Sequence, residues 1–340
     1  MPSSFLTPDI AVDLGTNNTR IYVKGRGIVI NEASLIVTRG ANSKNIVAIG
    51  DSALELIGRS GKEYRIIRPI RAGIIVDYEM AQVMLHYFIN KAIGRSFLAR
   101  PNVVIGVPGN ITQVARQSFI NIIEKLGIRQ HYVVDTAFAS ALGTGLSVYE
   151  PQGNLVVNIG AGTTEIALIS LGGIVFSQSL DVAGNALDEA IAQYLKKKYG
   201  LLLTERTAEQ IKFDLTDVRE EEAGDRVAVI RGRDVATGMP YTQDVPLKEI
   251  ASALKQSIQE IMTEIRRLLE KVPPELCVDI LKNGIFLTGG TSGLPGLDAL
   301  IATSFGVPVS IAREFGECTI LGSGYLADHF EILNSNAKIR

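Results

Sequence analysis

Cysteine is scarce in this chain: Cys277 and Cys318 are the only two among 340 residues. Two cysteines are too few for a disulfide framework, so we expect a protein of the reducing cytosol. A strong charge of either sign is also missing, because 34 lysine and arginine residues nearly balance 36 aspartate and glutamate residues. The net charge of −2 argues against a general nucleic-acid-binding protein, which would carry a basic excess.

Long apolar runs are lacking as well. No uninterrupted apolar stretch reaches the length of a membrane span. The segment Met1–Thr7 has neither a basic region nor a long apolar region of the kind found in a secretory signal. Apolar residues still make up 46% of the chain, which excludes a disordered protein and allows a large core. The length predicts roughly two domains.

The chain contains an internal repeat. Residues 9–29 read DIAVDLGTNNTRIYVKGRGIV, and residues 154–175 read NLVVNIGAGTTEIALISLGGIV, with Asp13 aligned to Asn158. Each copy predicts an apolar strand, a turn of Gly, Thr and Asn, a second β-branched strand, a glycine turn and a third strand. Two such copies predict two similar α/β domains that face each other.

Strands and helices alternate after each copy. Residues 102–107 form a short apolar run, typical of a strand that is buried on both faces. Helical patterns cover about residues 112–126, where Thr112 is a suitable N-cap, and about residues 186–198. The clearest helix, about residues 247–271, has apolar residues at steps of three and four. A coiled coil fits this stripe too, but the pattern lasts only about three heptads, so packing against a sheet is favoured.

Two segments look like insertions into the repeated scaffold, at about residues 33–74 and about residues 182–244. The second includes the acidic run Glu220–Glu222, which we interpret as a solvated loop. A turn-rich joint near residue 150 separates the halves. The two domains are therefore predicted at residues 1–150 and 151–340.

The turns that follow the first strand of each copy suit phosphate binding. They lie at Gly15–Thr19 and Gly160–Thr164. Small residues let backbone N–H groups approach phosphate oxygens, and threonine hydroxyls donate further hydrogen bonds. Either turn alone is more simply an ordinary hairpin turn. The pair favours binding, because a duplicated fold would place the turns on opposite walls of one cleft.

A third glycine-rich site lies in residues 284–299, which read GIFLTGGTSGLPGLDA. A strand at Ile285–Leu287 is followed by the turn Thr288–Ser292 and by a helix that opens near Pro295. Such a turn approaches a nucleotide closely, and helix N-termini favour anions. A glycine-rich turn with a helix cap explains the pattern equally well. Neither a Walker A motif nor G-x-G-x-x-G occurs at these turns, which disfavours P-loop and Rossmann sites.

These three motifs resemble those of the actin/Hsp70/sugar-kinase superfamily. Asp13–Thr19, Asn158–Glu165 and Leu287–Ser292 look like its phosphate-1, phosphate-2 and adenosine motifs. Within the superfamily, the chain closely resembles the MreB family, the bacterial actins of rod-shaped cells. Stretches such as RPIRAGIIVDYE (68–79) read like that family's sequence, and the resemblance covers about residues 8–330.

The resemblance implies an α/β, actin-like fold. It consists of two duplicated, ribonuclease H-like domains, each with a smaller inserted subdomain, and a nucleotide cleft between them. The C-terminal segment, about residues 315–330, would return to the first domain. ATP or ADP with Mg²⁺ would occupy the cleft. The protein would polymerise head to tail into paired protofilaments on the inner face of the cell membrane, together with membrane morphogenesis proteins, and help to determine cell shape.

The family's binding residues carry over by position. The phosphates would be held by Gly15, Thr16, Asn17, Asn18, Gly160, Gly162 and Thr163. The ribose and base would meet Glu209 and Lys212, which are spaced i, i+3 and so share a helix face. The adenosine would lie over Gly289, Gly290, Thr291 and Ser292. Asp13 would be the charged group nearest the metal, unless it serves only as an Asx-turn residue that opens the hairpin.

Two positions depart from the family's pattern. Asn158 stands where the family usually has a carboxylate, and an amide bonds a Mg²⁺-bound water without adding negative charge. The family's Glu-Glu-Pro segment reads Asp135-Thr136-Ala137 here, and Thr136 cannot act as a base at neutral pH. We therefore expect ATP binding with slow or absent hydrolysis, unless Asp135 reaches in from the adjacent position.

Phe97 and Leu98 form an apolar pair flanked by basic residues. From the residues alone, the pair fits the edge of a core equally well. In MreB proteins a comparable exposed pair inserts into the bilayer, so the resemblance implies a membrane contact here. One monomer would be held loosely, and a filament with many copies would attach firmly. Phe5 and Leu6 would add a second contact.

The alternative is a small-molecule, sugar-type kinase of the same superfamily. Such an enzyme needs a carboxylate base for the acceptor hydroxyl and enlarged insertions to cover its substrate. The segment PGNITQ (108–113) contains neither Asp nor Glu, and the insertions are modest, which disfavours this alternative. A chaperone is disfavoured because no substrate domain follows residue 330. We expect the filament protein rather than either of these.

Overall fold

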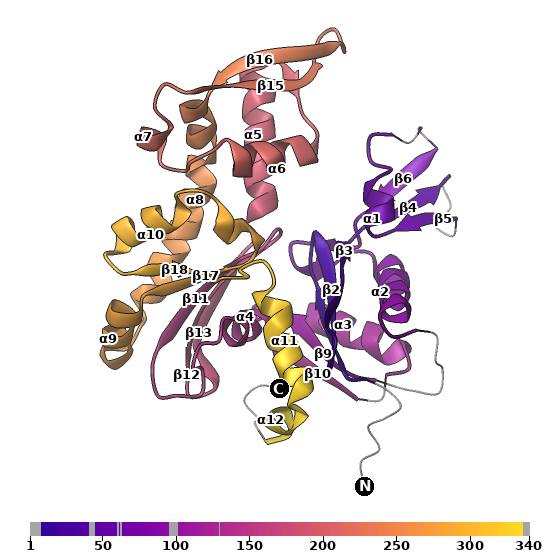
Figure 1. Cartoon of the computed structure of the whole chain (residues 1–340), viewed down its shortest axis with the longest axis vertical. Helices are drawn as coiled ribbons and strands as arrows, with labels where there is room; N and C mark the ends of the chain where they lie inside the picture. Colours follow the sequence, from indigo (N-terminus) through magenta and orange to yellow (C-terminus); the bar gives the residue numbers. More distant parts are fainter. Residues whose placement is uncertain are drawn as a thin grey trace. The chain divides into compact units, whose positions relative to one another are not determined.

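The structure is a computed structural model that describes residues 8–40, 45–59, 61, 63–94, 101–128 and 130–335. The chain forms two compact units (Figure 1). Unit 1 is drawn from Met1–Pro151, Ile169–Val175 and Glu317–Arg340. Unit 2 is drawn from Gln152–Leu168 and Phe176–Gly316.

A five-stranded sheet forms the centre of unit 1. Its strands are, in spatial order, β10 (Gln130–Asp135), β9 (Asn102–Val107), β1 (Ile10–Leu14), β2 (Asn18–Val23) and β3 (Gly27–Ala33). β1 runs parallel to β9 and antiparallel to β2. β9 is buried along Val103–Val107, as predicted for a strand with neighbours on both sides and covered faces.

Outside the first insertion, unit 1 also contains the helices α2 (Tyr78–Ile93), α3 (Gln113–Lys125), α4 (Thr136–Gly143), α11 (Cys318–Asp328) and α12 (Phe330–Ser335). α3 begins where the sequence predicts, because the Thr112 hydroxyl accepts a hydrogen bond from the Ala115 N–H at 3.1 Å. Phe88 of α2 and Phe119 of α3 are fully buried in one core with Ile105 of the sheet.

α11 packs against α4 with the two backbones in contact. A Cβ atom at Gly143 would overlap the carbonyl oxygen of Cys318, and one at Gly322 would overlap that of Ala139. Only glycine fits at both positions. α11 also lies against β1 and β9, so this helix from the end of the sequence completes the packing of the first sheet.

The first predicted insertion forms small elements beside this sheet. They are β4 (Ile36–Arg39), β5 (Ile46–Ile49), α1 (Asp51–Leu54), β6 (Tyr64–Ile67), β7 (Ile70–Arg71) and β8 (Ile74–Ile75). Three of the strands pair in the order β5-β4-β6, and β7 pairs with β8. The turn between β7 and β8 places Ala72 and Gly73 at φ angles of 45° and 68°.

Unit 2 repeats the plan of the first sheet. Its strands are, in spatial order, β13 (Gly173–Leu180), β12 (Thr164–Ser170), β11 (Asn154–Ile159), β17 (Ile285–Thr288) and β18 (Val309–Ile311). In both sheets the first strand is central, the second and third lie on one side, and the fourth and fifth on the other. The shared strand order confirms the duplication that the sequence repeat predicts.

The other elements of unit 2 are α5 (Gly184–Tyr199), β14 (Leu201–Leu202), α6 (Glu205–Asp214), α7 (Glu220–Ala223), β15 (Val227–Asp234), β16 (Pro240–Pro246), α8 (Leu247–Leu269), α9 (Pro274–Asn283), the 3-10 turn η1 (Gly290–Gly293) and α10 (Leu297–Phe305). The apolar stripe of α8, with Ile258, Ile261 and Ile265, is buried in the core of its own unit. The coiled-coil interpretation is therefore excluded for this face. In the part of the chain that the structure describes, no helix is long and apolar enough to cross a membrane.

One local expectation in unit 2 was wrong. The acidic run forms the one-turn helix α7 instead of a loop, and its carboxylates have basic partners: Glu220 pairs with Lys255 at 3.5 Å and Glu222 with Arg219 at 3.6 Å. The helix expected near Pro295 is confirmed, and it begins at Leu297. The chain reaches it through Gly296, whose φ of 80° is a conformation that glycine tolerates.

Candidate functional site

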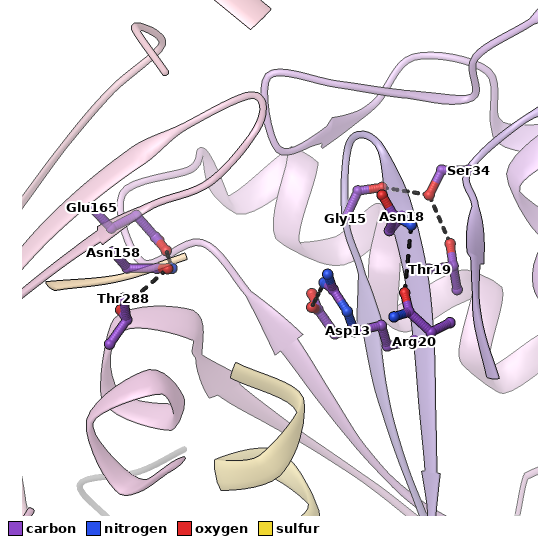
Figure 2. A network of polar contacts seen from close by, with 10 residues as sticks. Asp13, Gly15, Asn18, Thr19, Arg20, Ser34, Asn158, Glu165 and Thr288 are labelled. Atoms are coloured by element: carbon purple, nitrogen blue, oxygen red, sulfur yellow. Dashed lines mark hydrogen bonds and ion pairs between the residues drawn. The ribbon is translucent and has the colours of Figure 1, made fainter. Parts of the chain in front are cut away.

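A glycine turn joins β1 to β2. The Gly15 N–H donates to the Asn18 carbonyl at 3.1 Å, and a Cβ at Gly15 would lie 2.6 Å from that oxygen. Ser34 supports the turn from the side, because its hydroxyl donates to the Gly15 carbonyl at 2.7 Å (Figure 2). The Ser34 N–H donates to the Asn17 carbonyl at 2.8 Å. These bonds fix the predicted phosphate-1 turn in one shape.

The predicted side chains of this turn differ in exposure. Thr16 is buried, and its hydroxyl accepts a hydrogen bond from the Gly73 N–H at 3.1 Å, which ties the turn to the β7–β8 hairpin. Asn17 and Asn18 are half-buried. The Asn18 amide donates to the Asn31 side chain at 3.4 Å. Thr16 therefore serves the internal structure, and the two asparagines lie closer to the surface.

Asp13 and Arg20 face each other across β1 and β2. Their side chains form an ion pair at 3.3 Å (Figure 2). Burial raises the pKa of Asp13, and the charge and hydrogen bond of Arg20 act in the opposite direction. The predicted metal-side carboxylate thus already has a cationic partner in its own hairpin.

The turn between β11 and β12 has the same backbone pattern. The Gly160 N–H donates to the Thr163 carbonyl at 2.9 Å. The Gly160 carbonyl accepts hydrogen bonds from the Thr291 hydroxyl at 2.7 Å and from the Gly184 N–H at 3.1 Å. Gly162 and Thr163 are half-buried. Within unit 2 the predicted phosphate-2 turn is therefore in direct contact with the predicted adenosine motif.

Asn158 is held at both ends of its amide (Figure 2). Its NH₂ group donates to Glu165 Oε2 at 3.1 Å, and its oxygen accepts from the Thr288 hydroxyl at 3.4 Å. All three residues are buried. Glu165 was not singled out by the sequence reasoning. The repeat could have pointed to Glu165, because the alignment that pairs Asn158 with Asp13 also pairs Glu165 with Arg20.

The predicted adenosine motif is the turn from β17 into η1. Gly289 has a φ of 86°, and a Cβ there would overlap the Ile159 carbonyl, so the turn requires glycine. The Ser292 hydroxyl donates to the Thr288 carbonyl and holds the turn closed. Gly290 is exposed and faces open space. The motif thus combines a fixed backbone at Gly289 with open space at Gly290.

Lys212 and Glu209 lie in different environments despite their i, i+3 spacing. The Lys212 side chain is 2% exposed, and its Nζ lies 2.8 Å from Asp188 Oδ1. It also donates to the Gly184 carbonyl at 3.1 Å. Glu209 is exposed on the same helix. Asp188, a second residue that the sequence reasoning missed, has its pKa raised to about 6 by burial, although Lys212 opposes the shift.

Asp135 and Thr136 lie where β10 passes into α4. Asp135 Oδ1 accepts a hydrogen bond from the Ala137 N–H at 2.8 Å, so this carboxylate caps the helix. Burial raises the pKa of Asp135, while the capping bonds and Arg116 lower it. Thr136 is buried, and its methyl group would lie 3.2 Å from a Cβ at Gly106. The residues available at this position are thus a capping carboxylate and a packed hydroxyl.

The predicted membrane residues Phe97 and Leu98, like Phe5 and Leu6, lie outside the described residues. Over the ranges that the structure does describe, no three His, Cys, Asp or Glu side chains gather closely enough to hold a metal ion.

Solved structures share this architecture. MreB 5 of Spiroplasma citri, in a crystal structure bound to AMPPNP, superposes with a TM-score of 0.91 and 31% identity, covering 98% of this chain and 100% of that one. The structure titled MamK double helical filament gives a TM-score of 0.80 at 23% identity, covering 95% of this chain and 99% of that one. The fold is therefore actin-like, as predicted.

The sequence matches the MreB/Mbl protein family over residues 7–335. The cell shape-determining protein Mbl of Bacillus subtilis (strain 168) is 40% identical over 325 residues, which are 96% of this chain and 97% of Mbl. The cell shape-determining protein MreB of Escherichia coli (strain K12) is 39% identical over 326 residues, 93% of this chain and 92% of that protein. This chain belongs to the MreB/Mbl family. The predicted family is confirmed, and the sugar-type kinase is not favoured.

Proposed function

We propose that this protein is an ATP-binding cytoskeletal protein that polymerises into filaments and helps to determine cell shape. Its relatives in B. subtilis and E. coli are named as cell shape-determining proteins. MreB5 of S. citri has been crystallised with AMPPNP and with ADP. The observation that carries the proposal is the pair of equivalent glycine turns at Gly15 and Gly160, each directly after the central strand of its sheet.

The turns and the β17–η1 segment suit the parts of an adenine nucleotide. Backbone N–H groups of both glycine turns would bind the phosphates, since small residues expose them. The adenosine would lie along Gly289–Ser292, where Gly290 leaves open space for a flat base. Glu209, which is exposed, would meet the ribose hydroxyls. Lys212, which is buried, would lie on the inner side of the nucleotide base.

Beside each turn, within its own unit, lie side chains whose oxygens suit a magnesium ion that is held mainly by the nucleotide. Asp13, Asn158 and Glu165 offer carboxylate and amide oxygens, the ligand type that Mg²⁺ prefers. Mg²⁺ usually keeps several waters and uses one or two protein carboxylates together with phosphates. When bound, the ion would neutralise phosphate charge. Asp13 and Asn158 would bind through its waters, and Glu165 would hold the Asn158 amide in a fixed orientation.

We infer that hydrolysis of ATP is slow or absent. A general base is typically worth about 10²–10⁴-fold in rate. Thr136 has no basic group at neutral pH, and its methyl group packs against Gly106. The Asp135 carboxylate is engaged as the N-cap of α4. A threonine that cannot act as a base, beside a carboxylate whose Oδ1 caps α4, supports binding without rapid turnover.

Self-association is proposed as head-to-tail assembly into paired protofilaments. Such assembly needs two different complementary surfaces on one monomer and gives an open filament. We propose that the actin-like domains are residues 1–150 and 151–340, and that the segment 315–330 returns to the first. The packing of α11 on α4 supports this return.

Pelleting by ultracentrifugation tests this function. Wild-type protein is expected to sediment with ATP or AMPPNP and to remain soluble without nucleotide. Phosphate release measured in the same samples should stay low. A protein that remains in the supernatant with ATP and phosphorylates a sugar would instead be a kinase of the superfamily.

Attachment to the inner face of the cell membrane, beside membrane morphogenesis proteins, is proposed on the apolar pair Phe97-Leu98. Burying two such side chains in lipid contributes about 3–6 kcal/mol per monomer, and avidity in a filament multiplies this attachment. The double change Phe97→Ser, Leu98→Ser should abolish co-sedimentation with anionic liposomes and leave pelleting without lipid intact. Retained lipid binding would refute the proposal.

A further inference from the structure

Lys212 and Asp188 connect α6 to the first turns of α5 inside unit 2. The ion pair is 2.8 Å long, and the two side chains are 2% and 13% exposed. Burying two charges costs much of what their attraction contributes, so such a pair is weak evidence for stability alone. The ammonium group also donates to the Gly184 carbonyl at 3.1 Å. The location of the pair, at Gly184, suggests a second role.

Gly184 is where the predicted phosphate-2 turn and adenosine motif meet. Its N–H donates to the Gly160 carbonyl at 3.1 Å, which also accepts the Thr291 hydroxyl at 2.7 Å. A Cβ at Gly184 would lie 2.6 Å from the Thr291 hydroxyl oxygen and 3.4 Å from Lys212 Nζ. No side chain fits between these groups. A shift of Lys212 would therefore move Gly184 and, through it, both motifs.

We propose that Asp188 is a positioning residue of the nucleotide site. By holding Lys212 against Gly184, the ionised Asp188 carboxylate keeps the Gly160 turn and η1 at the separation that binds nucleotide. This inference rests on the nucleotide-binding function proposed above. It adds a residue to that site which acts through Lys212 and whose charge, rather than shape, is required.

The charges around Asp188 set the pH range of the effect. Lys212 attracts the carboxylate, and Glu205 and Glu209, also on α6, repel it. β14, which packs on α5, carries only leucines, and Glu249 of α8 bonds to tyrosines near the other end of α5. Burial raises the pKa of Asp188 to about 6. Nucleotide affinity should therefore be highest above pH 7, where Asp188 is ionised, and should fall as the pH drops through about 6.

Fluorescent ADP and AMPPNP analogues would measure this on the full chain. Asp188→Asn keeps the size of the side chain and removes its charge, so the Kd should rise about tenfold at neutral pH. Asp188→Glu keeps the charge and should recover most of the affinity. The matched control is Glu189→Gln, an adjacent exposed carboxylate that should leave the Kd unchanged. Wild-type affinity should fall on acidification more steeply than that of Asp188→Asn.

The outcomes separate this inference from the function on which it rests. A wild-type chain that binds no nucleotide overturns the function. A wild-type chain that binds, with Asp188→Asn equally tight, overturns only the role of Asp188. Equal losses in Asp188→Asn and Asp188→Glu would show that shape matters and also overturn it. If Asp188→Asn fails to fold, by circular dichroism, a wild-type affinity that stays flat from neutral pH to about pH 5 overturns it.

Discussion

In unit 1 the residues that face each other below the glycine turn are Asp13 and Arg20, whereas unit 2 has Asn158 and Glu165. The members of both pairs lie 145 positions from their counterparts in the other copy. Each pair bonds across the first two strands, at 3.3 Å and 3.1 Å. The unit 1 pair sums to no charge, and the unit 2 pair to one negative charge. Both copies keep the glycine turn, but the carboxylate lies on the first strand in unit 1 and on the second strand in unit 2.

The largest effect is expected from the difference in the room that the two glycine turns leave for a Cβ atom. A Cβ at Gly15 would lie 2.6 Å from the Asn18 carbonyl, whereas one at Gly160 would lie 3.2 Å from the Thr163 carbonyl. Gly15→Ala should lower the free energy of unfolding by about 3 kcal/mol and Gly160→Ala by about 1 kcal/mol, as urea titration measures. Gly290→Ala, which meets nothing within 4 Å, is the control. Equal losses of unfolding free energy in Gly15→Ala and Gly160→Ala would show that the two turns do not differ in the room for a Cβ atom.

The next effect concerns the rate of ATP hydrolysis, for which unit 1 would supply the residue at position 136. Thr136→Glu adds a carboxylate at the start of α4 and should raise single-turnover phosphate release about hundredfold. Both this variant and the neutral control Thr136→Gln should lose stability, because Thr136 is buried against Gly106. The rates of the two variants are therefore compared with each other. Equal rates would show that a missing base does not limit hydrolysis.

A smaller effect should follow when the missing carboxylate is restored in unit 2. Asn158→Asp would place two carboxylates at a hydrogen-bonding distance, which raises the pKa of one of them. The variant should lose about 1–2 kcal/mol at neutral pH and regain it as pH falls below that raised pKa. Thermal unfolding at acidic and neutral pH measures this. Unchanged stability at neutral pH would mean that Glu165 does not face position 158 as an anion.

The exchanged pair is the matched control for that variant. In the double variant Asn158→Asp, Glu165→Gln, an amide again donates to a carboxylate, so stability should return to the wild-type value. Because one carboxylate remains, the Mg²⁺ dependence of ADP affinity should also persist. Glu165→Gln alone should weaken that dependence. If all three variants depend on Mg²⁺ as the wild type does, the unit 2 pair does not contribute to the metal site.

The smallest effect concerns the residues two positions beyond Arg20 and Glu165 on the second strands. The Tyr22 hydroxyl donates to Asp328 of α11 at 2.8 Å, whereas the equivalent residue in unit 2 is the buried Ala167. Tyr22→Phe should cost about 1 kcal/mol. Burial, with the Asp328 hydrogen bond, raises the pKa of Tyr22 to about 12. The difference between wild type and variant should therefore be full below about pH 10 and vanish as pH rises through about 12.

The control for this prediction is Tyr241→Phe, in which an exposed hydroxyl that bonds to Gln243 is lost. Exposed groups exchange such a bond for one to water, so this variant should be near neutral. A loss as large as that of Tyr22→Phe would show that the alkaline effect is not specific to α11.

Features with a local cause could be predicted from the sequence. The two hairpins follow from alternating strands and glycine turns, the start of α3 from the Thr112 cap, and α8 from its apolar spacing. Glu165 and Asp188 were missed because their partners, Asn158 and Lys212, come from other elements. Helix spacing placed Lys212 on one face but not inside the unit, since burial is decided by what packs over that face.

The glycine crossing of α4 and α11 has a consequence for biosynthesis. The helix that packs on Gly143 is Cys318–Asp328, which is synthesised long after α4. The core of unit 2, drawn from residues within 152–316, is synthesised in full before that helix emerges. Unit 1 is therefore translated first but completes its packing after unit 2, because the surface of α4 that contacts α11 stays uncovered until α11 has been synthesised.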